Sequence, residues 1–185
     1  MSLNLFKSNL IRYMSTEPDS SDDFAEYLTS QYDGAVKRGT DLLNAVPLQT
    51  GNTATMELIL KGFFRMNNFK QSGTLNIQDW GPAFKAYWLG AQGGLFPPPA
   101  IPADGTIQNI SSQVHLIINP GQWSTNIPTP PANSVKSFVD VLALAIVAHL
   151  MTVEGIIITT SLYPTAPTPL PGPGVRTWKG YQIPG

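Results

Sequence analysis

The stretch NSVKSFVDVLALAIVAHLMTVEGIIIT, residues 133–159, decides the fold of this chain. It carries no charge between Asp140 and Glu154, and its apolar residues occupy almost every position around a helix. A helix that is apolar all round is buried on all sides in a globular protein. The stretch therefore predicts a central helix over residues 133–159, covered by other helices of the same chain.

The uncharged part of this stretch is too short for a membrane span. As a helix, residues 141–153 measure about 20 Å, whereas the hydrocarbon core of a bilayer is about 30 Å thick. The stretch also contains His149. Near the N-terminus, Lys7 and Arg12 interrupt the apolar residues, so we expect neither a signal peptide nor a transmembrane segment.

Four amphipathic helices are predicted ahead of the central one, over residues 3–15, 20–46, 52–73 and 79–92. The second begins with Ser20 as its N-cap and carries acidic residues in its first turn, where the helix dipole favours them. Asn52 or Thr53 caps the third, and Pro82 suits the first turn of the fourth. Pro47, Gly73 and Gly93-Gly94 mark the ends of these helices.

Two Pro-rich regions complete the chain. Prolines exclude long regular elements from residues 95–132, apart from a short strand at 114–118, yet large apolar residues there favour an ordered loop on a surface. From Pro164 the sequence favours an extended polyproline conformation. We therefore predict a mostly α fold of about five helices, with residues 1–162 as the domain and 163–185 as an extended C-terminal arm.

Charge is distributed unevenly along the chain. Residues 1–85 hold 17 of the 23 charged side chains, and residues 86–185 hold six. A free domain usually has about a quarter of its residues charged. The helix at 141–153 explains part of the depletion by burial, whereas the loop at 95–132 and the arm point to a surface covered by a partner. The net charge of −1 predicts no nucleic-acid partner.

Aromatic and apolar residues in the Pro-rich regions are the candidate contacts with that partner. No helix covers Trp123 or Trp178, and Tyr181 and Ile183 follow on the same predicted arm. An aromatic residue on an extended segment often anchors in a pocket of a neighbour. We predict interface roles for Trp123, Trp178, Tyr181 and Ile183, whereas Trp80, Tyr87 and Trp88 are predicted to pack in the core.

The sequence offers little catalytic chemistry. It contains no cysteine and lacks the Walker, Gly-x-Gly-x-x-Gly and Gly-x-Ser-x-Gly patterns. The cluster of Asp19, Asp22, Asp23 and Glu26 stands at a helix start, where acids cap the helix. His149 is predicted to be buried and hydrogen-bonded, although it and His115 could meet in space. We predict no catalytic residue, no metal site, no cofactor and no small-molecule substrate.

The chain resembles the virion proteins of tailed bacteriophages, especially small tail, neck or head-associated subunits of large contractile-tailed phages. The features that it shares with them are the opening Ser-Leu-Asn-Leu-Phe-Lys, the absence of cysteine, a second half rich in Asn, Thr, Gln and Pro, and a terminal arm with Trp178. This resemblance implies a building block present in many copies, located in the virion and assembled in the host cytoplasm. It carries over no functional residue.

The expected function is therefore that of a non-enzymatic structural subunit, which assembles with copies of itself and with other structural proteins through its loop and arm. One alternative is a binding module for a carbohydrate, a peptide or a host surface, which would use exposed aromatics. A second is a Pro-x-x-Pro ligand at residues 164–171. A third is an enzyme of unfamiliar type that uses His115, His149 and Asp or Glu partners.

Overall fold

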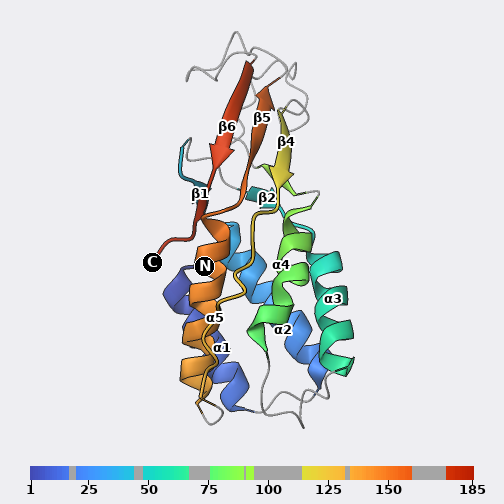
Figure 1. Cartoon of the computed structure of the whole chain (residues 1–185), viewed down its shortest axis with the longest axis vertical. Coiled ribbons are helices and arrows are strands. Elements are labelled where there is room, and N and C mark those ends of the chain that lie inside the picture. Colours follow the sequence, from blue (N-terminus) through green and yellow to red (C-terminus); the bar gives the residue numbers. More distant parts are fainter. Residues whose placement is uncertain are drawn as a thin grey trace, which may run out of the picture.

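The computed structural model describes residues 1–16, 20–43, 48–66, 76–89, 91–93, 114–131, 134–159 and 174–185. Within these ranges the protein is mostly helical, as predicted for the fold class, and it also contains small sheets (Figure 1). The helices are α1 (Leu3–Ser15), α2 (Ser21–Val36), α3 (Thr53–Met66), the 3₁₀ helix η1 (Ile77–Trp80), α4 (Gly81–Trp88) and α5 (Val135–Leu150).

The strands form three small antiparallel sheets. The largest contains β4 (Val114–Asn119), β5 (Glu154–Thr159) and β6 (Gly174–Lys179), in that order across the sheet. It extends away from one end of the helical body (Figure 1). Where the sheet meets the helices, β1 (Thr40–Asp41) pairs with β7 (Tyr181–Gln182), and β2 (Leu48–Thr50) pairs with β3 (Gln92–Gly93).

One hydrophobic core joins the helices. Its largest side chains are aromatic and come from different helices: Phe24 packs against Phe64, and Phe64 against Trp80, with ring centroids 5.4 and 5.2 Å apart. Trp80 then contacts Phe138 of α5 at 5.7 Å. α2, α3, η1 and α5 are thereby tied together by ring contacts.

Most helices begin where the sequence predicts. The Ser20 hydroxyl accepts the N–H of Asp23 at 3.1 Å, and the Asn52 side chain accepts the N–H of Thr55 at 3.2 Å. α1 ends at Ser15, the predicted position, and Pro82 lies in the first turn of α4. The predicted strand at 114–118 is confirmed as β4.

The predicted end of α2 near residue 46 is wrong, because the helix stops at Val36. The chain then tightens into a turn in which Gly39 donates to Val36 O at 2.8 Å, and β1 follows, paired with β7. A Cβ at Gly39 would overlap the carbonyl group of Gln182. Tertiary pairing with the other end of the chain thus overrides the apolar stripe that favours a longer helix.

The predicted central helix over 133–159 is also wrong at its C-terminal end. α5 stops at Leu150, and residues 154–159 form the middle strand of the three-stranded sheet. The physical reason lies in the sequence of β5, Glu-Gly-Ile-Ile-Ile-Thr, because glycine disfavours a helix and the β-branched residues favour a strand.

One more predicted helix end differs. α4 stops at Trp88 instead of near residue 92, and Gln92–Gly93 pair with Leu48–Thr50 as a strand. α3 is described to Met66, and its predicted stop at Gly73 lies outside the described residues. Residues 94–113 and 160–173, which include much of both Pro-rich regions and the Pro-x-x-Pro spacing, lie outside them as well.

Residues 174–185 do not form an arm that leaves the domain. β6 pairs with β5 along its whole length, and β7 pairs with β1. The backbone N–H of Leu3 donates to Pro184 O at 2.7 Å, which ties the segment to α1 as well. The end of the described chain therefore belongs to the same folded unit as its beginning.

Candidate interaction surfaces

Tyr181 and Ile183, two of the predicted interface residues, lie in the core of their own chain. Tyr181 is 1% exposed and Ile183 is 7% exposed. The Tyr181 hydroxyl lies 2.8 and 2.7 Å from the carbonyl oxygens of Val36 and Gly39, and it accepts the N–H of Leu48 at 2.9 Å. Tyr181 thus bonds to the turn that ends α2 and to Leu48, and this hydroxyl is engaged within its own chain.

Trp123 is half-buried, and it holds residues 120–131 against the helices. Its ring stacks on Phe84 at 4.6 Å with an interplanar angle of 12°, and its Nε1 donates to Ile77 O at 3.1 Å. A Cβ at Gly81 would lie 2.8 Å from the Trp123 ring, so this glycine allows the close approach. The ring is engaged within the chain and presents at most one edge to a partner.

Trp178 and His115 are placed only by their backbones. Trp178 lies in β6 opposite Gly155, and His115 lies in β4 opposite Ile158. Their side chains are outside the described part of the structure, as is any meeting of His115 with His149. The interface role of Trp178 stays a prediction.

His149 is buried and hydrogen-bonded, as predicted. Its Nε2 lies 2.7 Å from Pro120 O, and its ring contacts Trp123 edge-on at 5.5 Å. Burial lowers the pKa of His149 to about 4, against a weaker opposing effect of the Pro120 carbonyl. The imidazole is therefore neutral at pH 7 and donates from Nε2, which leaves Nδ1 with only a lone pair. Its role here is to fasten the 120–131 segment to α5.

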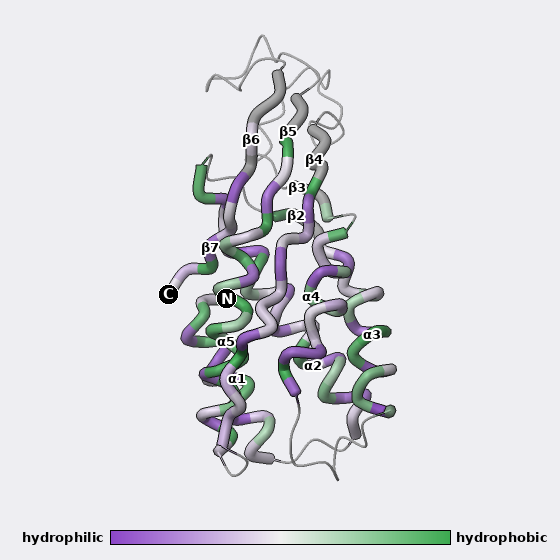
Figure 2. The backbone as a smooth tube through the Cα atoms, viewed as in Figure 1, coloured by the Kyte–Doolittle hydropathy of each residue, from purple (hydrophilic) through white to green (hydrophobic). Residues whose placement is uncertain are grey.

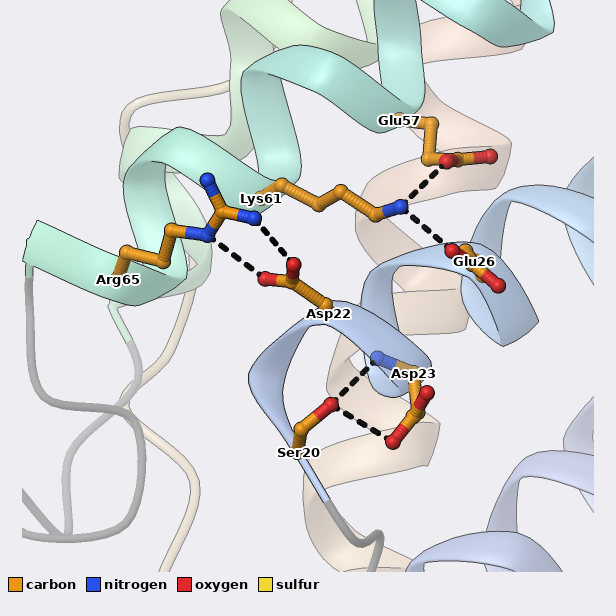
Figure 3. A network of polar contacts seen from close by, with 7 residues as sticks. All are labelled: Ser20, Asp22, Asp23, Glu26, Glu57, Lys61 and Arg65. Carbon is orange, nitrogen blue, oxygen red and sulfur yellow. Dashed lines mark hydrogen bonds and ion pairs between the residues drawn. The ribbon is translucent and has the colours of Figure 1, made fainter.

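The predicted acidic cluster caps and braces the helices, as Figure 3 shows. The Ser20 hydroxyl donates to Asp23 at 2.6 Å, and both guanidinium contacts of Arg65 go to Asp22. These hydrogen bonds from Arg65 hold the pKa of Asp22 below its usual range. Asp19 lies outside the described residues. The described acids belong to structural contacts of α2.

The remaining contacts of this cluster join α2 to α3. Lys61 of α3 reaches Glu26 of α2 at 2.5 Å and Glu57 of its own helix at 2.7 Å (Figure 3). We call this group, with Arg65 and Asp22, the α2–α3 seam. It covers the junction of two helices with paired charges that remain in contact with water.

Trp80, Tyr87 and Trp88 are core residues, as predicted. All three are buried. Trp88 Nε1 donates to the Tyr32 hydroxyl at 2.9 Å, and the Tyr87 hydroxyl donates to Asp33 at 2.8 Å. Burial raises the pKa of both tyrosines. These rings are covered by protein and cannot stack on a sugar or a base.

α5 exposes apolar side chains along one side, contrary to the prediction of burial all round. Leu144 is 66% exposed, Met151 is 51% exposed and Val147 is 38% exposed. Ala148 is exposed between them. Positions 144, 148 and 151 follow one another at four- and three-residue spacing, so they share one side of the helix. We call Leu144, Val147, Ala148 and Met151 the outer face of α5.

A second exposed apolar surface lies on α3. Leu58 is 71% exposed and Met66 is 80% exposed, and a Cβ added at Gly62 would meet no atom within 4 Å. Figure 2 shows how apolar and hydrophilic residues alternate along this helix. We call Leu58, Gly62 and Met66 the outer face of α3. Unlike the outer face of α5, it adjoins charged residues, because Lys61 and Arg65 lie within the same turns.

Neither outer face was found by sequence reasoning. An apolar circumference indicated burial on every side of α5, but the described helices cover only part of it. The apolar pattern of residues 141–153 does not indicate which side of the helix the other helices leave uncovered. For α3, the amphipathic pattern did not single out Leu58 or Met66 as exposed.

Comparison with protein-family models, with curated proteins and with solved structures gave no match. Among the described residues, no group of three or more His, Asp or Glu side chains is placed to hold a metal ion. In the same residues, no helix combines the length and the apolar character that a membrane crossing requires.

Proposed function

We propose that this protein is a non-enzymatic structural subunit of a multimeric assembly. The observation that supports this is the exposure of apolar side chains on two ordered helices, α3 and α5. Large apolar patches on a soluble domain commonly mark surfaces that another protein covers. Both patches lie on regular helices, so burying them requires no ordering of a loop.

The route of assembly differs from a free terminal arm. Tyr181 and Ile183 complete the core of their own chain, and Trp123 fastens the 120–131 segment to the helices. The outer helix faces take the place of these residues as the contacts between subunits. The remaining stretches of the Pro-rich loop and tail lie outside the described residues and stay candidates for additional contacts.

We further propose that the assembly is a virion, of the kind built by tailed bacteriophages. This part rests on the resemblance in composition and not on the fold. The binding-module alternative has lost support, because Trp80, Trp88 and Tyr181 are buried and Trp123 is stacked within the chain. The described polar clusters are occupied by capping and ion pairing.

The mass of the full chain in solution tests the assembly. Light scattering behind a sizing column, over the micromolar range, is expected to show a species heavier than one 20.0 kDa chain. A monomer at every concentration contradicts the proposal. The virion part has a separate test: mass spectrometry of purified particles from the source of the gene should find the chain, and its absence from them contradicts that assignment.

A further inference from the structure

The outer face of α5 is bordered by α1 on one long side and by the uncharged 120–131 segment on the other. α1 lies along one side, where Lys7 binds Asp140 at 2.5 Å near the start of α5. The 120–131 segment lies along the other side, held by His149 and by Thr152, whose hydroxyl accepts the N–H of Gln122 at 2.8 Å. From residue 120 to residue 131 this segment contains no charged residue. An apolar centre with a polar border is typical of a protein–protein interface.

From this arrangement we infer that the outer face of α5 binds the same face of a second copy, with the two α5 helices antiparallel about a two-fold axis near Leu144. The inference rests on the proposed function, since it names the contact by which two subunits associate. In such an isologous contact one patch serves both partners, and the pair closes on itself.

Charge favours the antiparallel orientation. At the N-terminal end of α5, Lys136, Lys7 and Asp140 carry a net charge of +1. Beyond its C-terminal end, Glu154 and Lys179 stand opposite each other in β5 and β6 and balance. A parallel pair would place the two positive ends together, and it would also align the two helix dipoles. An antiparallel pair brings exposed Lys136 of one copy to the level of Glu154 of the other.

The size of the face is sufficient for a stable pair. α5 has 16 residues and is therefore about 24 Å long, and a helix is about 10 Å wide with its side chains. If α1 and the 120–131 segment each add a strip of similar width, the contact area reaches about 700 Å². A standard interface buries roughly 800 Å² on each partner. Met151 and Val141 extend the apolar centre toward both ends of this footprint.

The outer face of α3 is a weaker candidate for this contact. Lys61 and Arg65 lie within its turns and are ion-paired with Glu26, Glu57 and Asp22 of the α2–α3 seam. A partner covering Leu58 and Met66 would remove water from these charges, which weakens association. On α5 the charged residue nearest to the outer face is Asp140, one turn before Leu144 and paired with Lys7 and Lys136, and no charged residue follows it to the end of the helix at Leu150.

Sedimentation equilibrium of three full-length proteins tests the contact: the wild type, Leu144→Glu and Leu58→Glu. Leu58→Glu is the matched control, because Leu58 on α3 is 71% exposed and Leu144 on α5 is 66% exposed. We expect Leu144→Glu to weaken self-association at least 100-fold and Leu58→Glu to leave it within about twofold. Far-UV circular dichroism checks that both variants keep their helices, and Met151→Glu repeats the test if Leu144→Glu does not fold.

Each result separates the inference from the proposed function. A wild type that is a monomer throughout contradicts both. A wild type that self-associates, with Leu144→Glu and Met151→Glu unaffected, overturns the α5 contact and leaves the assembly proposal standing. If Leu58→Glu alone dissociates it, the contact lies on α3 and the inference is wrong.

The orientation of the two helices is tested by disulfide cross-linking. Because the chain has no cysteine, only the introduced cysteines can form a disulfide. About an axis near Leu144, position 141 of one copy lies beside position 148 of the other. A mixture of Val141→Cys and Ala148→Cys proteins should therefore form a mixed disulfide, and each protein alone should form little. Homodimeric disulfides from each protein alone would show a parallel pair, and the absence of any cross-link would likewise overturn the antiparallel contact.

Discussion

The α2–α3 seam and the outer face of α5 are both surfaces of helices packed on one core, yet they meet water in opposite ways. At the seam, Lys61 and Arg65 form ion pairs with three carboxylates, and every charged group there remains accessible to solvent. On α5, Leu144 and Met151 present uncharged surface instead. Packing against the core accounts for the buried sides of α2, α3 and α5. Of the two surfaces compared, only the seam has the charged, solvated exterior that is typical of a free monomer.

The largest expected effect is the difference in stability between truncating a buried and an exposed leucine of α5. Leu142 is fully buried, so Leu142→Ala should lower the free energy of unfolding by about 2–5 kcal/mol through lost contacts and a residual cavity. Leu144→Ala should change it by no more than about 0.5 kcal/mol, as is usual for exposed sites. Urea denaturation at low protein concentration measures both. Equal losses would mean that Leu144 is covered within its own chain.

Acid should weaken the fastening of the 120–131 segment to α5. His149 has a folded-state pKa of about 4, below the usual value of 6.5, so the unfolded chain binds a proton first as the pH falls. The stabilisation is complete above pH 6.5, and about 2 kcal/mol of it is lost by pH 5 and about 3 kcal/mol by pH 4.

His149→Gln provides the control for this pH dependence. Chemical denaturation at pH 8, 6 and 5 should show a smaller decline for the variant than for the wild type. His115 is present in both proteins, so the difference between the two curves reports His149 alone. Identical slopes would contradict the burial of a neutral imidazole at this position.

A smaller effect on stability is expected at the N-terminus of α2. Ser20→Ala removes the acceptor of the Asp23 N–H and should cost about 1 kcal/mol of stability. Ser30→Ala, an exposed position inside the same helix, should be neutral or slightly stabilising because alanine favours helix interiors. Thermal unfolding followed by circular dichroism compares the two. A Ser30→Ala variant as unstable as Ser20→Ala would show that capping is not the cause.

The smallest expected effect concerns the ion pairs. Arg65→Gln should destabilise the protein slightly at low salt and not measurably at 1 M NaCl, where the Debye length falls to about 3 Å. Self-association of the wild type should instead persist or strengthen in 1 M NaCl, because the outer face of α5 is uncharged. Thermal melting of Arg65→Gln and sedimentation of the wild type, each at low salt and in 1 M NaCl, measure these two effects. An association that weakens in 1 M NaCl would contradict the expectation for α5.

Helix starts could be predicted in this chain, whereas helix ends could not. Ser20 and Asn52 act through bonds to residues only three positions away, so the local sequence contains the whole cause. The end of α2 depends on Gly39 meeting Gln182, and such a contact leaves no local signal. For β5, the β-branched run favoured a strand, but the long apolar pattern before it suggested that the helix continues.

The candidate interface shows a related limit. The sequence predicts interface roles for Trp123, Tyr181 and Ile183 because they lie in a Pro-rich segment and on an extended tail, where no local helix covers them. Their covering comes instead from distant segments: Phe84 stacks on Trp123, and Val36, Gly39 and Leu48 surround the Tyr181 hydroxyl. An apolar residue in an irregular segment can therefore belong to the core, while one on a regular helix can face outward.

The bonds of Tyr181 also bear on how fast this protein folds. They join positions 145 and 142 residues apart, so they close nearly the whole described chain into a loop. Contacts between residues so far apart in sequence form slowly, because the chain must lose much conformational entropy before the contacts contribute any stabilising free energy. Closure by Tyr181 is thus expected among the last steps of folding. Each molecule would finish its own topology before it meets another, with the order of events set by chain entropy.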